Sequence, residues 1–438
     1  MLLVGALVAL VWANSPWEAS YRALWSTPVT VEIGAVPLHH LASLDLLAVV
    51  NDGLMALFFF VVALEIKREL VSGELRDPRT AALPVIAAVG GMIVPALIYT
   101  GFAAGTAGAH GWGIPMATDI AFAVGIMSLV PGVPTGARLF LLTLAIVDDL
   151  GAIVVIAVAY TSDLHLGWLV ASLGGLAVTA LVARSDVRAQ GPYWALGIVV
   201  WLCVLESGVH ATLAGVAMGF LTPSWSFYNP GRFTERARPL VDDVNRSFAD
   251  GLLTVDESER NDDALDALMH LANESRSPLD RMVRRLGPWT AYVIVPVFAF
   301  ANAGIRFPPV DTLGQPVVVG VAVGLVVGKA VGVFAVTWVA LRLRIGVLPP
   351  GVGLRELFGL ALCAGVGFTV ALFVATLSFP DDPALGDEAR LGILVGSLVA
   401  GVLGYTWLRA TTKRRGSAPE RSPAGPDPAT VEAPTPIS

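Results

Sequence analysis

Long apolar stretches, separated by short polar segments, follow one another through most of the chain. A membrane helix needs about 20 consecutive apolar residues, whereas a membrane β-strand needs only about 10 alternating ones. The stretches here are too long and too continuous for strands. The pattern predicts an all-α polytopic membrane protein with about 12 transmembrane helices, at 1–14, 45–66, 81–102, 113–130, 137–160, 166–183, 192–206, 208–221, 289–305, 317–341, 353–379 and 387–408.

A short external hairpin is predicted at 29–38, where apolar and polar residues alternate around Gly34. The same alternation also fits an extended loop. Residues 194–221 could form one long helix, but its length of about 28 residues exceeds a single crossing. Because Ser207 and Gly208 supply a break, we expect two helices there.

Composition and charge agree with this topology. Hydrophobic residues make up 55% of the chain and charged residues 14%, as in a membrane protein. Cytoplasmic loops of such proteins carry an excess of Lys and Arg. If the predicted helices alternate in direction from a cytoplasmic N-terminus, only the arginines Arg22, Arg306 and Arg390 fall on the external side. Both termini are therefore predicted to be cytoplasmic.

The segment at 222–287 is long and charged. Its acidic centre at 250–266 is predicted to be solvated or mobile, and an amphipathic helix is expected to begin near Ser277 and to lead into Trp289. The predicted organisation is transmembrane helices 1–8 at 1–221, a charged cytoplasmic loop at 222–287, transmembrane helices 9–12 at 288–409, and a disordered cytoplasmic tail at 410–438.

Two aspartates, Asp148 and Asp149, lie side by side in the middle of an apolar stretch. One aspartate at the centre of a membrane helix costs about 2.5–3.5 kcal/mol, so the pair costs about 5–7 kcal/mol. Each surrounding Leu, Ile or Val returns only about 0.3–0.6 kcal/mol. Because ionisable residues inside a membrane are usually functional, the pair is the first candidate site.

Two of the predicted helices are interrupted. The fourth contains Pro115 shortly before Asp119, and the eleventh contains Gly365 and Gly367. Unwound backbone at bilayer depth is tolerated only where it is packed in protein or lines a cavity. A pair of interrupted helices in corresponding positions of the two halves of a chain indicates inverted repeats with a site near the membrane midplane.

Lys329 is the one lysine inside an apolar stretch. It needs a counter-charge or must lose its proton, which an arginine could not do. Adjacent helix positions point about 100° apart, so one of Asp148 and Asp149 can face an ion while the other faces a cation such as Lys329. Alternatively, Asp148 and Lys329 form only a structural ion pair, and Asp119 only caps an interrupted helix.

Hard alkali cations prefer oxygen ligands, and the candidates are Asp149, Asp119, the Thr118 hydroxyl and carbonyls freed by the breaks. A carboxylate in a low dielectric tends to take up a proton, whereas bound Na⁺ favours its ionised form. Competition of the two for one carboxylate is enough for exchange. The sequence has no His/Cys cluster typical of a transition-metal site, and no cofactor is expected.

The chain resembles the NhaA-type bacterial sodium/proton antiporters, and the likeness runs in order through nearly the whole chain outside the loop and tail. The matching stretches are Asn51-Asp-Gly-Leu-Met-Ala-Leu-Phe58, Ala63-Leu-Glu-Ile-Lys-Arg-Glu-Leu70, Pro115-Met-Ala-Thr-Asp-Ile-Ala-Phe-Ala123, Leu144-Ala-Ile-Val-Asp-Asp-Leu-Gly-Ala-Ile153, Ser207-Gly-Val-His-Ala-Thr-Leu-Ala-Gly215, Phe298-Ala-Phe-Ala-Asn-Ala-Gly304 and Gly365-Val-Gly-Phe-Thr369.

The resemblance implies an NhaA-like fold with inverted repeats, in which two interrupted helices cross at the midplane. It implies that Asp148 and Asp149 are the paired carboxylates of the ion site and that Thr118 and Asp119 lie at the crossing. Lys329 matches the membrane lysine that pairs with Asp148. On this reading Asp149, Asp148 and Thr118 are the expected Na⁺ ligands.

The resemblance also implies a function and partners. The chain is expected to be no enzyme but a secondary transporter of the plasma membrane, which exchanges internal Na⁺ or Li⁺ for external protons, electrogenically, in sodium and pH homeostasis. Besides the lipid bilayer, sodium and protons, it is expected to bind a second copy of itself, and no nucleic acid.

Four residues match family positions tied to pH response: Glu65, Arg68, Glu69 and His210. From the residues alone, Glu65 and Glu69 equally fit a solvated charged turn at a helix end, and His210 fits a packed histidine. The chain also departs from the family before the ninth helix, where Val283, Arg284 and Gly287 replace an acidic residue and two histidines. The pH profile therefore cannot be carried over.

Two other classes of protein are disfavoured. An intramembrane aspartyl protease also needs two membrane carboxylates, but it places them on separate helices, commonly as Tyr-Asp and Gly-x-Gly-Asp, and neither motif occurs here at a suitable depth. A channel or a membrane receptor would not require a titrating lysine such as Lys329, and the long loop is predicted to be cytoplasmic.

Overall fold

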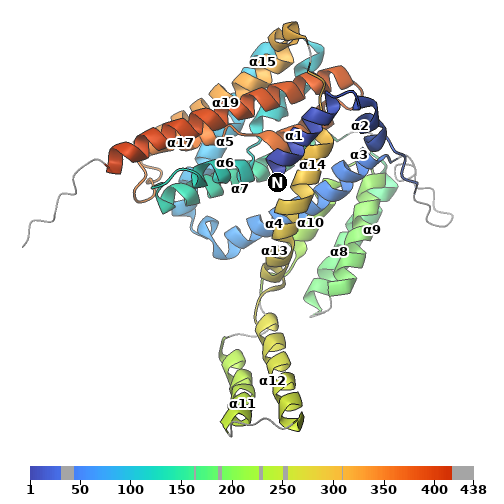
Figure 1. Cartoon of the computed structure of the whole chain (residues 1–438), viewed down its shortest axis with the longest axis vertical. Helices are drawn as coiled ribbons and strands as arrows, with labels where there is room; N and C mark the ends of the chain where they lie inside the picture. The colour runs from blue at the N-terminus through green and yellow to red at the C-terminus, as the bar shows by residue number, and fades with distance from the viewer. Residues whose placement is uncertain are drawn as a thin grey trace, which may run out of the picture.

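A computed structural model describes residues 1–30, 44–161, 164–185, 190–225, 230–249, 255–307 and 309–416 (Figure 1). These residues are mainly helical and form no strand; Pro28 and Asp45 make a single antiparallel bridge. The helical elements are α1 (Leu2–Ala13), α2 (Glu18–Trp25), α3 (Leu46–Ala48), η2 (Val49–Leu54), α4 (Met55–Ser72), η3 (Glu74–Arg76), α5 (Pro78–Ala103), η4 (Ala107–Met116), α6 (Ile120–Ser128), α7 (Thr135–Ala159), α8 (Leu166–Arg184), α9 (Gln190–Glu206), α10 (Thr212–Leu221), α11 (Pro230–Ala249), α12 (Val255–Glu274), α13 (Pro278–Trp289), η5 (Thr290–Ile294), α14 (Val295–Asn302), η6 (Val310–Gly314), α15 (Pro316–Val323), η7 (Gly324–Gly328), α16 (Lys329–Arg342), α17 (Leu354–Cys363), α18 (Phe368–Ser378) and α19 (Pro383–Gly416).

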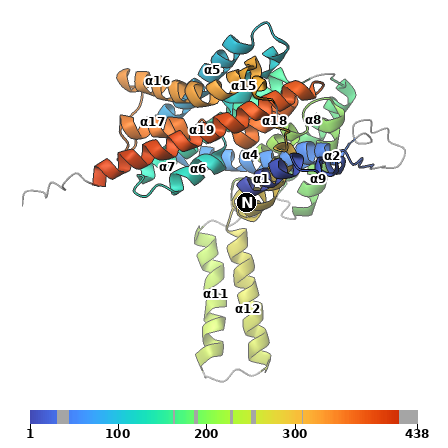
Figure 2. The ribbon, with the colours of Figure 1, turned by 45° about the horizontal axis from the view of Figure 1, so that its top comes forward.

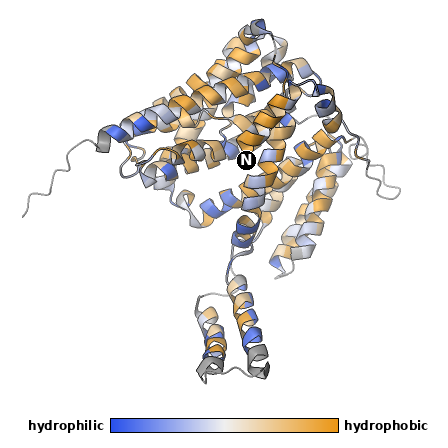
Figure 3. Cartoon of the chain, viewed as in Figure 1, coloured by the Kyte–Doolittle hydropathy of each residue, from blue (hydrophilic) through white to orange (hydrophobic). Residues whose placement is uncertain are grey.

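The predicted all-α membrane class is confirmed, because the body is built from apolar helices (Figure 3). Within the described ranges, 6 helices are long and apolar enough to cross a membrane, or up to 8 if each bent pair is one span. The bent pairs are α1 with α2, at 119°, and α17 with α18, at 47°. The six helices are Leu46–Ser72, Pro78–Ala103, Thr135–Ala159, Leu166–Arg184, Pro316–Arg342 and Pro383–Lys413.

Helices α5 and α16 pack with their backbones in contact. A Cβ atom at Gly90 would lie 2.5 Å from the carbonyl oxygen of Gly332 and 2.6 Å from Val336 Cγ2. Small residues allow membrane helices to approach this closely. Gly332 lies one helical turn from Lys329, so the close packing of α16 on α5 also fixes the position of the lysine.

Gly90→Ala is expected to lower the thermal unfolding temperature, because overpacking a close contact costs about 1–3 kcal/mol. The control is Gly101→Ala on the same helix, where no described atom lies within 4 Å of the added Cβ; replacing a helical Gly there should be neutral or stabilising by about 0.5–1 kcal/mol. Tryptophan fluorescence of the purified protein during heating measures both. Equal unfolding temperatures for the two variants would contradict the close packing of α5 on α16.

The predicted charged loop at 222–287 is largely helical. Helices α11 and α12 lie side by side and extend away from the body (Figures 1 and 2). Of the acidic centre at 250–266, which is expected to be solvated or mobile, the described part from Val255 is helix α12. Despite the high charge, apolar residues at helical spacing are partly or fully buried, namely Phe233, Ala237, Leu240 and Val244 on α11 and Ala264, Leu268 and Leu271 on α12.

The amphipathic helix expected after Ser277 is present as α13. Ser277 caps it, because its Oγ accepts a hydrogen bond of 3.1 Å from Asp280 N. The buried Val283 packs in one apolar cluster with Phe60 and Leu64 of α4, whereas Arg284 is exposed. The altered positions before the ninth predicted helix therefore lie beside α4.

Two predicted segments fall wholly or mainly outside the described ranges. The hairpin at 29–38 does so from residue 31 onward; before it, Val29 N donates to Leu44 O at 2.8 Å. Of the predicted tail, residues 417–438 are not described, but α19 continues to Gly416 and so extends beyond the expected limit of 409. Residues 410–415 contain neither Gly nor Pro, so their sequence allows the helix to continue.

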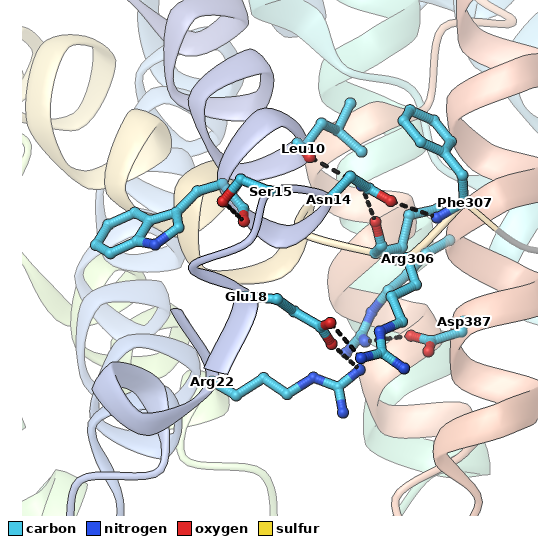
Figure 4. Close-up of polar contacts among 11 residues, drawn as sticks. Leu10, Asn14, Ser15, Glu18, Arg22, Arg306, Phe307 and Asp387 are labelled. Carbon is cyan, nitrogen blue, oxygen red and sulfur yellow. Dashed lines mark hydrogen bonds and ion pairs between the residues drawn. The ribbon is translucent and has the colours of Figure 1, made fainter. Parts of the chain in front are cut away.

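A polar cluster joins α2 to the segment that follows α14 (Figure 4). Glu18 pairs with Arg22 at 2.7 Å and with Arg306. Asn14 Nδ2 donates to Ile305 O at 2.8 Å. The hydrogen bond from Arg306 lowers the pKa of the Glu18 carboxyl, so this pair stays ionised at neutral pH.

Candidate functional site

Asp148 and Asp149 lie in the middle of α7 and are buried, with 0% and 1% of their surface exposed. α7 is an unbroken, mainly apolar helix of 25 residues, so its own backbone offers the two carboxylates no free polar groups. Such groups must find partners in other helices. The structure provides these partners from two breaks in the chain and from Lys329.

The first break separates η4 from α6, and Ala117, Thr118 and Asp119 lie in it. Asp119 is the N-cap of α6, and its Oδ1 accepts a hydrogen bond of 3.0 Å from Phe122 N. The second break separates α17 from α18 at residues 364–367. The two breaks contact each other directly, because Asp119 N donates to Val366 O at 2.6 Å.

Thr369, at the start of α18, strengthens this contact. Both its backbone N, at 3.1 Å, and its Oγ1, at 2.7 Å, donate to Asp119 Oδ2. Sequence reasoning noted the glycines of this segment but gave Thr369 no role. The available signal was a hydroxyl residue two positions after Gly367, where the N-terminus of a helix can accept a carboxylate.

Thr118 connects the breaks to α7. Its Oγ1 lies 2.5 Å from Asp148 Oδ2 and 2.8 Å from Ala364 O. A threonine hydroxyl has one proton, so it can donate to only one of these oxygens at a time. When it donates to Ala364 O, its lone pairs are available to a cation beside Asp148.

Lys329 Nζ donates to Asp148 Oδ2, and both side chains are fully buried. The lysine directly follows η7, a π-helical segment between Gly324 and Gly328. π-helical segments within α-helices are frequent at functional sites. A Cβ at Gly328 would lie 2.7 Å from Pro95 Cα, so the glycine lets this segment pack tightly on α5.

Asp149 is the least satisfied member of the group. Among the described residues, neither Asp149 Oδ1 nor Asp148 Oδ1 has a hydrogen-bond partner. Asp149 lies within electrostatic reach of Asp119 and Lys329. Buried carboxylate oxygens without donors can bind either a proton or a cation, so the arrangement is chemically suited to exchange.

Of the four predicted pH-response residues, Glu65 lies within electrostatic reach of Asp149, whereas His210 lies apart from the buried group. Glu65, Arg68 and Glu69 are partly buried on α4. His210 Nε2 lies 2.5 Å from Tyr160 O, at the end of α7. Tyr160 follows Asp149 by 11 residues, which places it about 16 Å away along the helix. His210 therefore does not contact the buried carboxylates.

The part of the chain that the structure describes contains no group of three or more His, Cys, Asp or Glu side chains placed to hold a metal ion. Cys203 and Cys363 are buried and unpaired with each other. The oxygen ligands of the candidate site come instead from carboxylates, one hydroxyl and backbone carbonyls, which suit a hard monovalent cation as cargo.

Comparison with known proteins identifies the family of the chain. A family model described as Na+/H+ antiporter 1 matches residues 1–408. The Na+/H+ antiporter NhaA of Oleidesulfovibrio alaskensis is 45% identical over 425 residues, 96% of this chain and 93% of the relative. NhaA 1 of Myxococcus xanthus is 46% identical over 417 residues (94% and 90%), and NhaA of Koribacter versatilis 41% over 433 residues (97% and 91%). The chain therefore belongs to the Na+/H+ antiporter 1 family, whose members are membrane secondary transporters and not enzymes.

Proposed function

We propose that this protein exchanges cytoplasmic Na⁺ or Li⁺ for external protons, electrogenically, and that it serves sodium and pH homeostasis. Membership of the family supports sodium/proton exchange. One structural observation supports the exchange chemistry: Asp148 and Asp149 are buried, each with an oxygen that lacks a hydrogen-bond partner in the described chain, and Lys329 pairs with Asp148. No cofactor is needed for this chemistry.

In this proposal Asp149 is the principal cation ligand, and Asp148 and Thr118 complete the site. Before sodium binds, Asp149 carries a proton, and Asp148 is paired with protonated Lys329. Sodium binding ionises Asp149 and draws Asp148 away from the lysine, which then loses its proton. Two protons leave for each Na⁺, so one net charge moves in each cycle.

We further propose twelve spans arranged as inverted repeats, with both termini cytoplasmic and the two interrupted helices crossing at the membrane midplane. The hydrogen bonds that Asp119 makes to Val366 and Thr369 support such a crossing. Glu65, Arg68, Glu69 and His210 would set the pH response from positions outside the ion site. The protein would work as a homodimer.

Everted membrane vesicles that contain a pH-sensitive dye test the proposed exchange. After respiration has acidified the vesicle interior, added Na⁺ or Li⁺ should drive protons out and restore dye fluorescence. Vesicles from cells without the protein are the control. The absence of a response to either cation at any pH between about 6.5 and 9, the span in which such carboxylates could titrate, would refute the proposed function.

A further inference from the structure

An apolar groove with a volume of about 820 Å³ runs between α1, α6 and α19. Its walls include Leu7 and Leu10 of α1, Phe122 and Gly125 of α6, and Leu398 and Val402 of α19. Leu7, Leu398 and Val402 are 57%, 69% and 54% exposed. In the twelve-span arrangement proposed above these helices lie in the membrane, and the groove would then open toward the interior of the bilayer.

The floor of the groove is part of the second break. Val366 and Phe368, which flank Gly367, both line it. Val366 O accepts the hydrogen bond from Asp119 N. Gly367 N donates a hydrogen bond of 3.3 Å to the Oγ of Ser397, which also lines the groove. Whatever fills the groove therefore contacts Val366, the residue whose carbonyl oxygen holds Asp119 N.

One end of the groove carries a polar, basic pair. Tyr405 of α19 lines the groove, and Arg409 Nη1 donates to its hydroxyl at 2.9 Å. The Arg409 guanidinium also lies 5.8 Å from the centre of the tyrosine ring, a cation–π distance. Lys413 follows one turn later, at the end of the candidate membrane span Pro383–Lys413. Positive charge at this level attracts the phosphates of anionic lipids.

The length of the groove suits a single leaflet. From Tyr405 to Leu394, both of which line the groove, α19 rises by about 16 Å over 11 residues. Half of the hydrocarbon core of a bilayer is about 15 Å. A lipid whose phosphate lies at Arg409 would thus reach the membrane centre at the depth of the break.

We propose that the groove binds one anionic phospholipid, with its phosphodiester at Arg409 and Tyr405 and one acyl chain against Val366 and Phe368. The apolar walls and the opening to the bilayer select an acyl chain, and the basic pair at the mouth selects an acidic headgroup. The bound chain would support the break that holds Asp119, so this lipid is a structural ligand rather than a transported substrate.

The test is native mass spectrometry of the purified, delipidated protein, titrated with palmitoyl-oleoyl phosphatidylglycerol. Gly125→Leu fills the groove, since no described atom lies within 4 Å of a Cβ at this position. Gly174→Leu on α8 is the matched control. A Cβ at this position is equally open, but α8 does not line the groove. Val402→Phe is a second filling variant. Arg409→Gln tests the headgroup contact.

Wild type and Gly174→Leu should bind one phosphatidylglycerol molecule that Gly125→Leu and Val402→Phe do not bind. Arg409→Gln should lower the affinity for phosphatidylglycerol about fivefold and leave phosphatidylcholine binding unchanged. The fivefold change corresponds to about 1 kcal/mol, the contribution of one basic residue near an anionic membrane surface. Unchanged retention in folded Gly125→Leu or Val402→Phe, or equal affinity of wild type for the two lipids, would overturn the proposal. None of these measurements depends on exchange activity.

Discussion

Asp149→Asn is expected to abolish sodium/proton exchange while the protein still inserts and folds. The amide has nearly the shape of the carboxylic acid but can neither ionise nor bind a proton, so Na⁺ and H⁺ would have nothing to compete for. Removing a buried group that requires a partner for its charge should not destabilise α7. The measurement is Na⁺-driven dye recovery in everted vesicles, with the amount of inserted protein determined in parallel.

The matched control is Asp387→Asn, the same chemical change at an exposed position of α19, where Asp387 pairs with Arg390 at 3.0 Å (Figure 4). It should leave exchange near the wild-type rate, because exposed ion pairs contribute little. Normal exchange by Asp149→Asn would rule out Asp149 as the shared site for sodium and protons.

Lys329→Met should destabilise the protein by about 3–5 kcal/mol, because it leaves the Asp148 carboxylate buried without its counter-charge. Methionine keeps much of the lysine's length and apolar volume, so loss of packing makes only a small part of the effect. The unfolding temperature of the purified variant should fall accordingly. We also expect exchange to be lost or strongly reduced, since one of the two proposed protons is carried by this lysine.

The double variant Asp148→Asn with Lys329→Met separates charge from packing. If the loss in Lys329→Met is that of an unpaired charge, the double variant should be clearly more stable than Lys329→Met alone, since it has no buried charge left to pair. An unfolding temperature of Lys329→Met equal to that of wild type would show that the pair has no role in stability. A double variant no more stable than Lys329→Met would assign the loss to packing.

The all-α membrane class of the body could be predicted because membrane helices have a strong and simple signal. Every predicted apolar stretch contains a helix, and the proline and glycine positions indicated both breaks. Their contact was expected only from the family resemblance and not from the local pattern, since the hydrogen bonds from Asp119 to Val366 and from Thr369 to Asp119 join residues about 250 positions apart. The α11–α12 hairpin was missed because charge, not periodicity, dominates its composition.

In the candidate site, too, local sequence features identified single residues but not their partners in other helices. Asp148, Asp149 and Lys329 were identifiable because charge is rare in apolar stretches. The choice of Asp148 as the lysine's partner depended on the family resemblance, and the structure places Lys329 Nζ on that carboxylate. Thr369 was not identified, because a single hydroxyl residue in a helix carries little sequence information without its acceptor.

The central claim is that sodium and protons compete for the same buried carboxylates, and proton release on sodium binding tests it most directly. Purified protein in weakly buffered detergent solution, with the pH set near the middle of its active range, should release protons when NaCl is added, but not when choline chloride is added. Asp149→Asn should release none. Sodium binding by the wild type without proton release would contradict the account.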